Sequence, residues 1–376
     1  MLIIAPLVML KYGQFMGVLD EEWQWLLPAS LPLGISFYTF QGWAYVTARL
    51  RGQLLQTPGF GRVALYLLFF PQLVAGPIVR PSQLIPQFDH FDRNRLAMLK
   101  NGLFLIVSGY IKKALLADNL AAWVDPVYAN PTGVGAGSVL LAVVAYGFQI
   151  YLDFSGYSDI AIGIARLFGI RLPENFRFPY SACDFQSFWR RWHITLSTWL
   201  RDHLYIPMGG SRRGKLRLVL ALGITMLLGG LWHGAHWNYV LWGGAHGLLL
   251  AVERWIRPGN RSQLFRRLYR FWTLGMVFLL WVPFRAGAYP DGWERMGSLL
   301  GRLMDVGAMW GSLPEKGVQW VLIVMLGYGV LSARGKSMWR WLVRWPAWAT
   351  GLLAVTVVLA VLLLAPGESS FIYFVF

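Results

Sequence analysis

The sequence contains one cysteine, Cys183, among its 376 residues. A single cysteine excludes an intramolecular disulfide and a metal cluster held by cysteine thiolates, so the fold must be stabilised by packing. The sequence also lacks a Walker loop, a nucleotide-binding glycine fingerprint and a serine or cysteine in a nucleophile elbow. The common nucleotide-binding sites and covalent hydrolase sites are therefore not expected.

Charged residues are scarce and acidic ones especially so. Only 14% of the residues are charged, with 18 acidic against 34 basic, whereas 56% are hydrophobic. Such a chain is too apolar for a soluble enzyme of this size, and we predict an all-α polytopic membrane protein forming one domain over residues 1–376. The basic residues lie in short loops between apolar runs, as topology determinants do. They indicate contact with membrane lipid headgroups and not with nucleic acid.

Unusual residues concentrate between Phe185 and Trp242. If residues 185–205 form one helix, its aromatic residues share one face opposite the charged ones, and His193 lies at the edge between the two faces. Two aromatic side chains per turn with a cationic back suit the wall of a cavity better than a span surrounded by lipid.

His233 is expected at membrane depth. The basic cluster 212–217 is placed on the cytoplasmic side by the positive-inside bias. No charge lies between Arg217 and His233, 16 residues later, and about 24 Å of helix is shorter than a hydrocarbon core of about 30 Å. Gly229, Gly230 and Gly234 could loosen the helix there, and an ionisable residue at that depth is a functional candidate.

Polar residues also crowd within an apolar run near residue 153. The group comprises Gln149, Asp153, Ser155 and Asp159. Carboxylates at membrane depth need partners or water. An alternative to a functional role is that Asp153 or Asp159 pairs with a nearby arginine and fixes helix packing. Earlier in the chain, Lys112 and Lys113 are expected to extend to an interface.

The strongest pair of candidate residues is His193 and His233. Folding of the 40 residues between them can bring the two imidazoles together, and a desolvated neutral imidazole is a suitable general base. The alternative is that each histidine fills a helix contact, which is also how we interpret His203 and His246. His233 and His236 could share a metal, but no carboxylate lies nearby in sequence, so no metal site is expected.

Several motifs of the chain together resemble the membrane-bound O-acyltransferase (MBOAT) family, and most of all its bacterial, alginate O-acetyltransferase-like branch. The resemblance runs in order over about residues 31–252. Its motifs are FYTFQGWAYV, FPQLVAGPIVRPSQLIPQF, YGFQIYLDFSGYSDIAIG, ENFRFPY, FWRRWHITLSTWLRDHLYIPMGG and GGLWHGAHWNYVLWGGAHG.

The resemblance implies a curved ring of roughly ten tilted and re-entrant helices around a tunnel through the membrane. His233 matches the catalytic histidine of the family, and His193 matches a supporting position in the tunnel. Other expected tunnel-lining or substrate-binding residues are Gln149, Asp153, Ser155, Asp159, Arg190, Trp192, Trp232, Trp237 and Asn238. Members of this branch usually carry an acidic residue near Ala48 and are longer at the N-terminus, so this chain departs from the pattern in both respects.

The function implied is transfer of an acyl group, most simply acetyl from acetyl-CoA or another thioester, to hydroxyls of an exported polysaccharide. The implied location is the bacterial cytoplasmic (inner) membrane, with an extracytoplasmic partner protein and no bound cofactor. Arg190 and Arg191 could meet a CoA phosphate or a lipid headgroup. Alternatives within the family are D-alanyl transfer to teichoic acid and acetyl transfer to peptidoglycan. Outside it, the alternative is a transporter or scaffold of an export complex, although the absence of a repeat disfavours inverted-repeat transporters.

Overall fold

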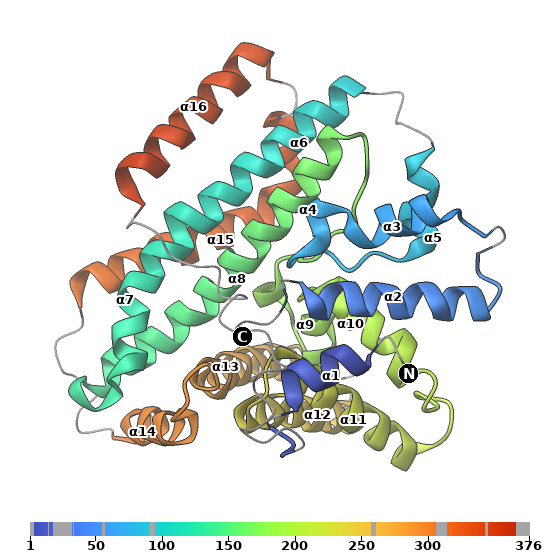
Figure 1. Cartoon of the computed structure of the whole chain (residues 1–376). Coiled ribbons are helices and arrows are strands. Elements are labelled where there is room, and N and C mark those ends of the chain that lie inside the picture. The colour runs from blue at the N-terminus through green and yellow to red at the C-terminus, as the bar shows by residue number, and fades with distance from the viewer. Residues whose placement is uncertain are drawn as a thin grey trace. The chain divides into compact units, whose positions relative to one another are not determined.

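The structure is a computed structural model that describes residues 4–13, 15–17, 32, 34–54, 57–89, 95–256, 261–305, 314–342 and 345–365. Across these residues every regular element is a helix (Figure 1), which confirms the all-α prediction. The start of the motif region, at residue 31, lies outside the described residues. Contacts divide the chain into two compact units, residues 1–109 with 157–175, and residues 110–156 with 176–376. The single domain over residues 1–376 remains a prediction.

The first unit is built from short helices around a small aromatic and aliphatic core. Its helices are α1 (Ala5–Tyr12), α2 (Ile35–Leu50), α3 (Phe60–Leu68), α4 (Phe70–Leu73), α5 (Pro81–Leu84), the 3-10 helix η2 (Ile85–Phe88) and α6 (Arg95–Tyr110), together with the last part of α8. Tyr66 is fully buried in the core, where its hydroxyl donates to the carbonyl oxygen of Val79 over 2.8 Å. That bond fixes the irregular chain after α4 to α3.

The second unit holds most of the chain. It begins with the π-helix η3 (Ile111–Ala117), α7 (Asp118–Ala129), the 3-10 helix η4 (Pro131–Gly133) and the first part of α8 (Ala136–Leu167). It continues through the 3-10 helix η5 (Pro179–Ser181), α9 (Phe185–Trp189), α10 (Ile194–Leu200), the π-helix η6 (Arg201–Tyr205), α11 (Lys215–His233), α12 (Trp237–Ile256), α13 (Gln263–Ala286), α14 (Gly292–Met304), α15 (Glu315–Leu342) and α16 (Ala347–Leu364).

Three described helices are long and apolar enough to cross a membrane. They are α8, α11 and the part of α15 from Glu315 to Arg334. Most of the span in α8 is buried within the protein, whereas most of that in α15 is exposed. The roughly ten segments that the resemblance implies include re-entrant helices, and many of the other apolar helices are shorter than about 20 residues.

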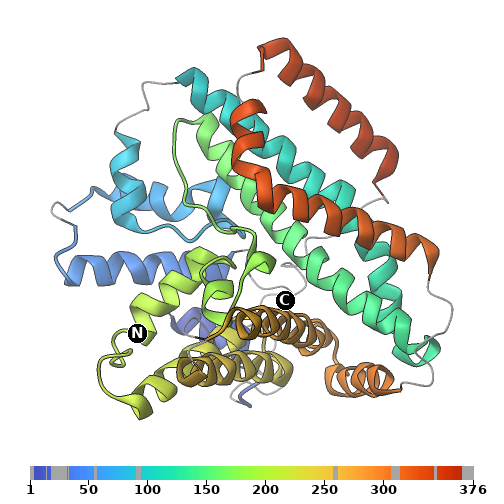
Figure 2. The same ribbon diagram turned by 180° about the vertical axis from the view of Figure 1, so that it is seen from behind.

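Glycines allow α11 and α12 to pack closely side by side, as both views show (Figures 1 and 2). A Cβ added at Gly230 would meet the carbonyl oxygen of Tyr239, and one at Gly243 would meet the carbonyl oxygen of Met226. The prediction that Gly229 and Gly230 loosen the helix is therefore wrong, since α11 continues without a break to His233. The glycines shorten the distance between helices instead.

Lys113 is buried with two carboxylates in the second unit. Its Nζ lies 2.7 Å from an oxygen of Asp118 and 2.7 Å from an oxygen of Asp153. Lys113 therefore does not extend to an interface as expected, and it pairs with Asp153, for which the sequence analysis named an arginine as the alternative partner. The lysine lies in η3, and a π-helical turn places it between the two carboxylates.

Candidate active site

The start of α9 is held in place by two carboxylates, those of Asp184 and Glu253. Asp184 caps α9 by accepting the backbone N–H of Ser187 over 2.6 Å, and the Ser187 hydroxyl closes a capping box. Glu253 of α12 binds the same helix start, because its two carboxylate oxygens accept the backbone N–H groups of Phe185 and Gln186 over 2.6 and 2.9 Å. The N-terminus of α9 is thus fixed to α12 by hydrogen bonds that involve a full negative charge.

His193 occupies the turn between α9 and α10. Its φ angle of 41° is in the left-handed region, which is rare for a residue other than glycine. Residues 185–205 therefore do not form one continuous helix. The imidazole is buried, edge-on to Phe154 with ring centroids 4.7 Å apart, and it also contacts Phe176 and Trp232. The aromatic cluster around the imidazole stabilises this strained backbone conformation.

His233 is the last residue of α11 and is also buried. Its ring lies 4.9 Å from Phe284 and 5.3 Å from Trp242, perpendicular to the latter. The ring of the preceding residue, Trp232, contacts both His233 at 4.9 Å and His193 at 5.9 Å. The two histidines thus share one tryptophan neighbour, as their predicted proximity requires.

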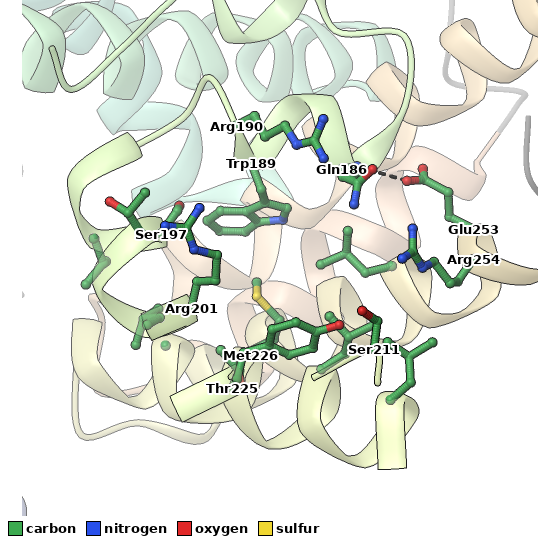
Figure 3. Close-up of a pocket in the computed structure, with 18 of the residues that line it drawn as sticks. Gln186, Trp189, Arg190, Ser197, Arg201, Ser211, Thr225, Met226, Glu253 and Arg254 are labelled. Carbon is green, nitrogen blue, oxygen red and sulfur yellow. Dashed lines mark hydrogen bonds between the residues drawn. The ribbon is translucent and has the colours of Figure 1, made fainter. Parts of the chain in front are cut away.

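His233 lines a pocket of about 960 Å³ in the second unit. Its walls come from α9, α10, α11 and α12, and in Figure 3 Trp189 and Arg190 lie across the pocket from Thr225 and Met226. Four lining cations are exposed to solvent, namely Arg190, Arg201, Lys215 and Arg254. His233 and Trp242 are buried. The pocket therefore runs from a positively charged rim to a buried histidine.

The other predicted site residues lie in different surroundings, and not all of them line the pocket. Arg190 lines the pocket, whereas Trp192 and Trp232 are buried in the aromatic cluster without lining it. Trp237, at the first residue of α12, is 59% exposed. Asn238 is buried, and its side-chain N–H donates to the carbonyl oxygen of Gly292 over 2.9 Å. Asn238 thereby joins the start of α12 to the start of α14.

The polar residues of α8 do not line this pocket. Gln149, Asp153 and Ser155 are buried within the second unit, where Asp153 pairs with Lys113. Asp159 belongs to the first unit and accepts a long hydrogen bond of 3.4 Å from the Ser108 hydroxyl. The role of these four residues in a tunnel remains a prediction.

Thr225 and Glu253 are among the pocket residues that were not anticipated from the sequence. Thr225 lines the pocket together with Gly229 and His233, at intervals of four residues that place all three on one face of α11. Once His233 is a candidate site residue, this spacing in the sequence predicts that Thr225 lies on the same helix face. Glu253 carried no such signal, because the N–H groups it binds lie 67 and 68 residues away in the chain.

His246 fills the aromatic core beside the pocket. It is fully buried, stacks parallel to Phe188, and contacts Trp189 and Trp242 with ring centroids 5.1 and 5.0 Å apart. Neither ring nitrogen has a hydrogen-bond partner among the described residues. His246 therefore acts as a packing ring, as the sequence indicated, and not as part of a polar network.

We expect His246→Phe to preserve activity, because phenylalanine keeps an aromatic ring in this position and removes two buried polar atoms. The initial rate of acyl transfer should stay within about 3-fold of wild type and the unfolding midpoint should not fall. Both are measured on purified protein in detergent. A loss of activity without a loss of stability would show that His246 has a chemical role.

Glu253 lies near the C-terminal end of α12, outside the three candidate spans. Burial raises its pKa above the ordinary value, and the N–H groups of Gln186 and Phe185 act in the opposite direction. Tyr269 adds a third hydrogen bond, donated over 3.1 Å. A buried carboxylate with three donors is a structural anchor for the pocket rim.

In Glu253→Gln, one acceptor oxygen is replaced by an amide N–H that faces a backbone N–H. We expect a loss of about 1–3 kcal/mol in local stability. Hydrogen exchange followed by mass spectrometry should show faster exchange at residues 185–187, whereas exchange in α15 should be unchanged. Equal exchange rates at residues 185–187 in the wild-type protein and in Glu253→Gln would contradict the anchoring role of Glu253.

Residues 1–286 match the sequence profile of the MBOAT, membrane-bound O-acyltransferase family. A relative from Pseudomonas putida, named a probable alginate O-acetylase, is 43% identical over 258 residues, covering 68% of this chain and 52% of the relative. A peptidoglycan O-acetyltransferase of Helicobacter pylori is 40% identical over 286 residues (68% and 54%). A teichoic acid D-alanyltransferase of Streptococcus thermophilus is 31% identical over 243 residues (60% and 57%). The chain spans about half the length of these relatives.

Proposed function

The chain belongs to the membrane-bound O-acyltransferase family, and from this premise we propose that it moves an acyl group from a thioester donor to a hydroxyl acceptor. The donor is proposed to occupy the pocket between α9, α10, α11 and α12, with His233 as the general base. The acyl group is proposed to be acetyl, because the two acetyl-transferring relatives share more of the sequence than the D-alanyl-transferring one.

The observation that supports this proposal is the polarity of the pocket. Its four exposed cations suit the phosphate groups of a donor such as acetyl-CoA, since guanidinium and ammonium groups bind phosphate strongly. Apolar side chains of α10 and α11, among them Leu196, Leu218 and Leu222, line its walls. The buried His233 is then the group beside which the thioester would lie. Lipid headgroups offer the same phosphate chemistry but carry no thioester.

The chemistry requires one base and two bound reactants. His233 takes the proton from the acceptor hydroxyl as its oxygen attacks the thioester carbonyl carbon. The tetrahedral intermediate then collapses, an ester forms, and the carbon–sulfur bond breaks. The imidazolium returns the proton to the departing thiolate, so the enzyme ends unchanged. His193 is proposed as a supporting residue that positions the Trp232 ring against His233.

The acceptor is proposed to be a hydroxyl of an exported polysaccharide, reached directly or through an extracytoplasmic partner protein. The proposed location is the bacterial inner membrane. The motifs in the sequence do not name the sugar, so alginate-like polymers and peptidoglycan are both acceptors to test. Teichoic acid D-alanylation is the remaining alternative within the family.

The test is the ester-linked acetyl content of exported polysaccharide from bacteria that lack their own gene and carry this chain. We expect the chain to restore acetylation and His233→Ala, at matched membrane levels, to fail. If the chain and the variant both restore it, His233 is not the base, and a transporter or scaffold becomes the better account. A modified polymer carrying D-alanine instead of acetyl would correct the acyl group.

A further inference from the structure

Two buried residues of the pocket wall carry hydrogen-bonding groups that have no partner among the described residues. Thr225 is 6% exposed and Trp242 is 1% exposed, and both line the pocket with His233. In the part of the chain that the structure describes, neither the Thr225 hydroxyl nor the Trp242 indole N–H makes a hydrogen bond. Other buried polar atoms of the described residues also lack a partner, but the groups of Thr225 and Trp242 lie in a pocket wall, where a bound molecule can supply one.

The Thr225 hydroxyl differs from three other threonines in helices of this protein. Thr47, Thr198 and Thr356 each donate to the carbonyl oxygen four residues earlier, over 2.8, 2.6 and 2.9 Å. That bond is the usual way for a helical threonine to satisfy its hydroxyl. Thr225, in the middle of α11, makes no such bond among the described residues and faces a pocket.

The Trp242 indole lies directly beside the proposed base. Its ring is 5.3 Å from the His233 ring and perpendicular to it, and it also contacts Trp189 at 5.7 Å. An indole N–H can only donate a hydrogen bond, so its partner must be an acceptor atom. Beside a general base in an acyl transfer, the acceptor that gains negative charge is the carbonyl oxygen of the thioester.

We propose that Trp242 and Thr225 are the hydrogen-bonding groups that hold the acyl donor at two separate points. The Trp242 N–H donates to the thioester carbonyl oxygen and binds it more strongly as it becomes an oxyanion. The Thr225 hydroxyl binds an amide of the donor's pantetheine arm, because it lies eight residues from His233, about 12 Å along α11. This inference rests on the proposed function, since it assumes that the pocket takes a thioester.

The two roles predict different kinetic effects. Thr225 would bind ground state and transition state alike, so Thr225→Val should raise the donor KM about 5- to 10-fold and leave kcat nearly unchanged. Trp242 would act mainly on the transition state, so Trp242→Phe should lower kcat about 100-fold with a donor KM within about 3-fold of wild type.

The chain offers a matched control for the threonine. Thr273, in α13, is also buried, and its hydroxyl lacks a partner among the residues described, but it does not line the pocket. Thr273→Val should leave donor KM and kcat within about 2-fold of wild type. For Trp242, site-specific incorporation of 3-benzothienylalanine replaces the N–H with sulfur and keeps the shape of the ring, so that it separates the hydrogen bond from packing.

The experiment measures kcat and donor KM with acetyl-CoA on the purified full-length chain. It also measures binding of a dethia analogue of acetyl-CoA, in which a methylene group replaces the thioester sulfur. The inference is supported if Thr225→Val weakens analogue binding about 5- to 10-fold and Thr273→Val does not, and if 3-benzothienylalanine at position 242 lowers kcat. It is overturned if the two valine variants bind the analogue equally, or if sulfur in place of the N–H leaves kcat unchanged. If the wild-type chain neither binds the analogue nor consumes acetyl-CoA, the proposed function fails, and this inference fails with it.

Discussion

Replacement of His233 by glutamine should lower the rate of acyl transfer by about 10²- to 10⁴-fold, the usual contribution of a general base. Glutamine retains a polar side chain of similar size at the end of α11 but cannot accept a proton from a hydroxyl at neutral pH. The measurement is the initial rate of acetyl-CoA consumption by purified protein with a polysaccharide acceptor. Binding of the uncleavable dethia analogue should be retained, because the cationic rim that we propose to bind its phosphates is untouched.

The control for this variant is His246→Phe, which changes another buried histidine in the same aromatic core that does not line the pocket. That variant should keep its rate. An equal loss in both proteins would mean that disruption of the aromatic core, and not loss of a base, explains the effect. Retention of the wild-type rate in His233→Gln would remove His233 from the mechanism.

Lys113→Met should be strongly destabilising, by about 3–5 kcal/mol. The substitution removes a cation that lies 2.7 Å from both Asp118 and Asp153, and with it a positive charge that stabilises two buried carboxylates. Breaking one side of a buried ion pair costs far more than the pair itself contributes. The measurement is the unfolding midpoint of the purified protein in detergent, with activity per folded molecule measured in parallel.

Two control variants test whether the loss of stability in Lys113→Met comes from its buried charges. Arg62→Met, which breaks an exposed ion pair with Asp89, should cost less than about 1 kcal/mol. Replacing all three buried charges, as Lys113→Met with Asp118→Asn and Asp153→Asn, should restore much of the lost stability. If Lys113→Met unfolds at the same midpoint as Arg62→Met, the buried charges do not stabilise the second unit.

The sequence predicted the features that depend on local pattern. The charge-free run after Arg217 identified the helix that ends at His233, and the apolar composition identified an all-helical membrane protein. The break at His193 was not predicted, because the buried imidazole there packs against Phe154 and Trp232, which come from other helices. Periodicity within residues 185–205 contains no information on those contacts.

The predicted surroundings of charged residues were less accurate for the same reason. Lys113 is followed in sequence by apolar residues, so its expected position was an interface, yet Asp153 from α8 holds it in the interior. That environment is set by which helices pack together, which a single sequence does not specify.

The most direct test of the account is an experimental structure of the full-length chain with the dethia analogue of acetyl-CoA. The account predicts that the analogue lies in the pocket between α9, α10, α11 and α12, with its acyl end at His233 and its phosphates among Arg190, Arg201, Lys215 and Arg254. An analogue bound elsewhere, or one whose acyl end lies away from His233, would contradict it.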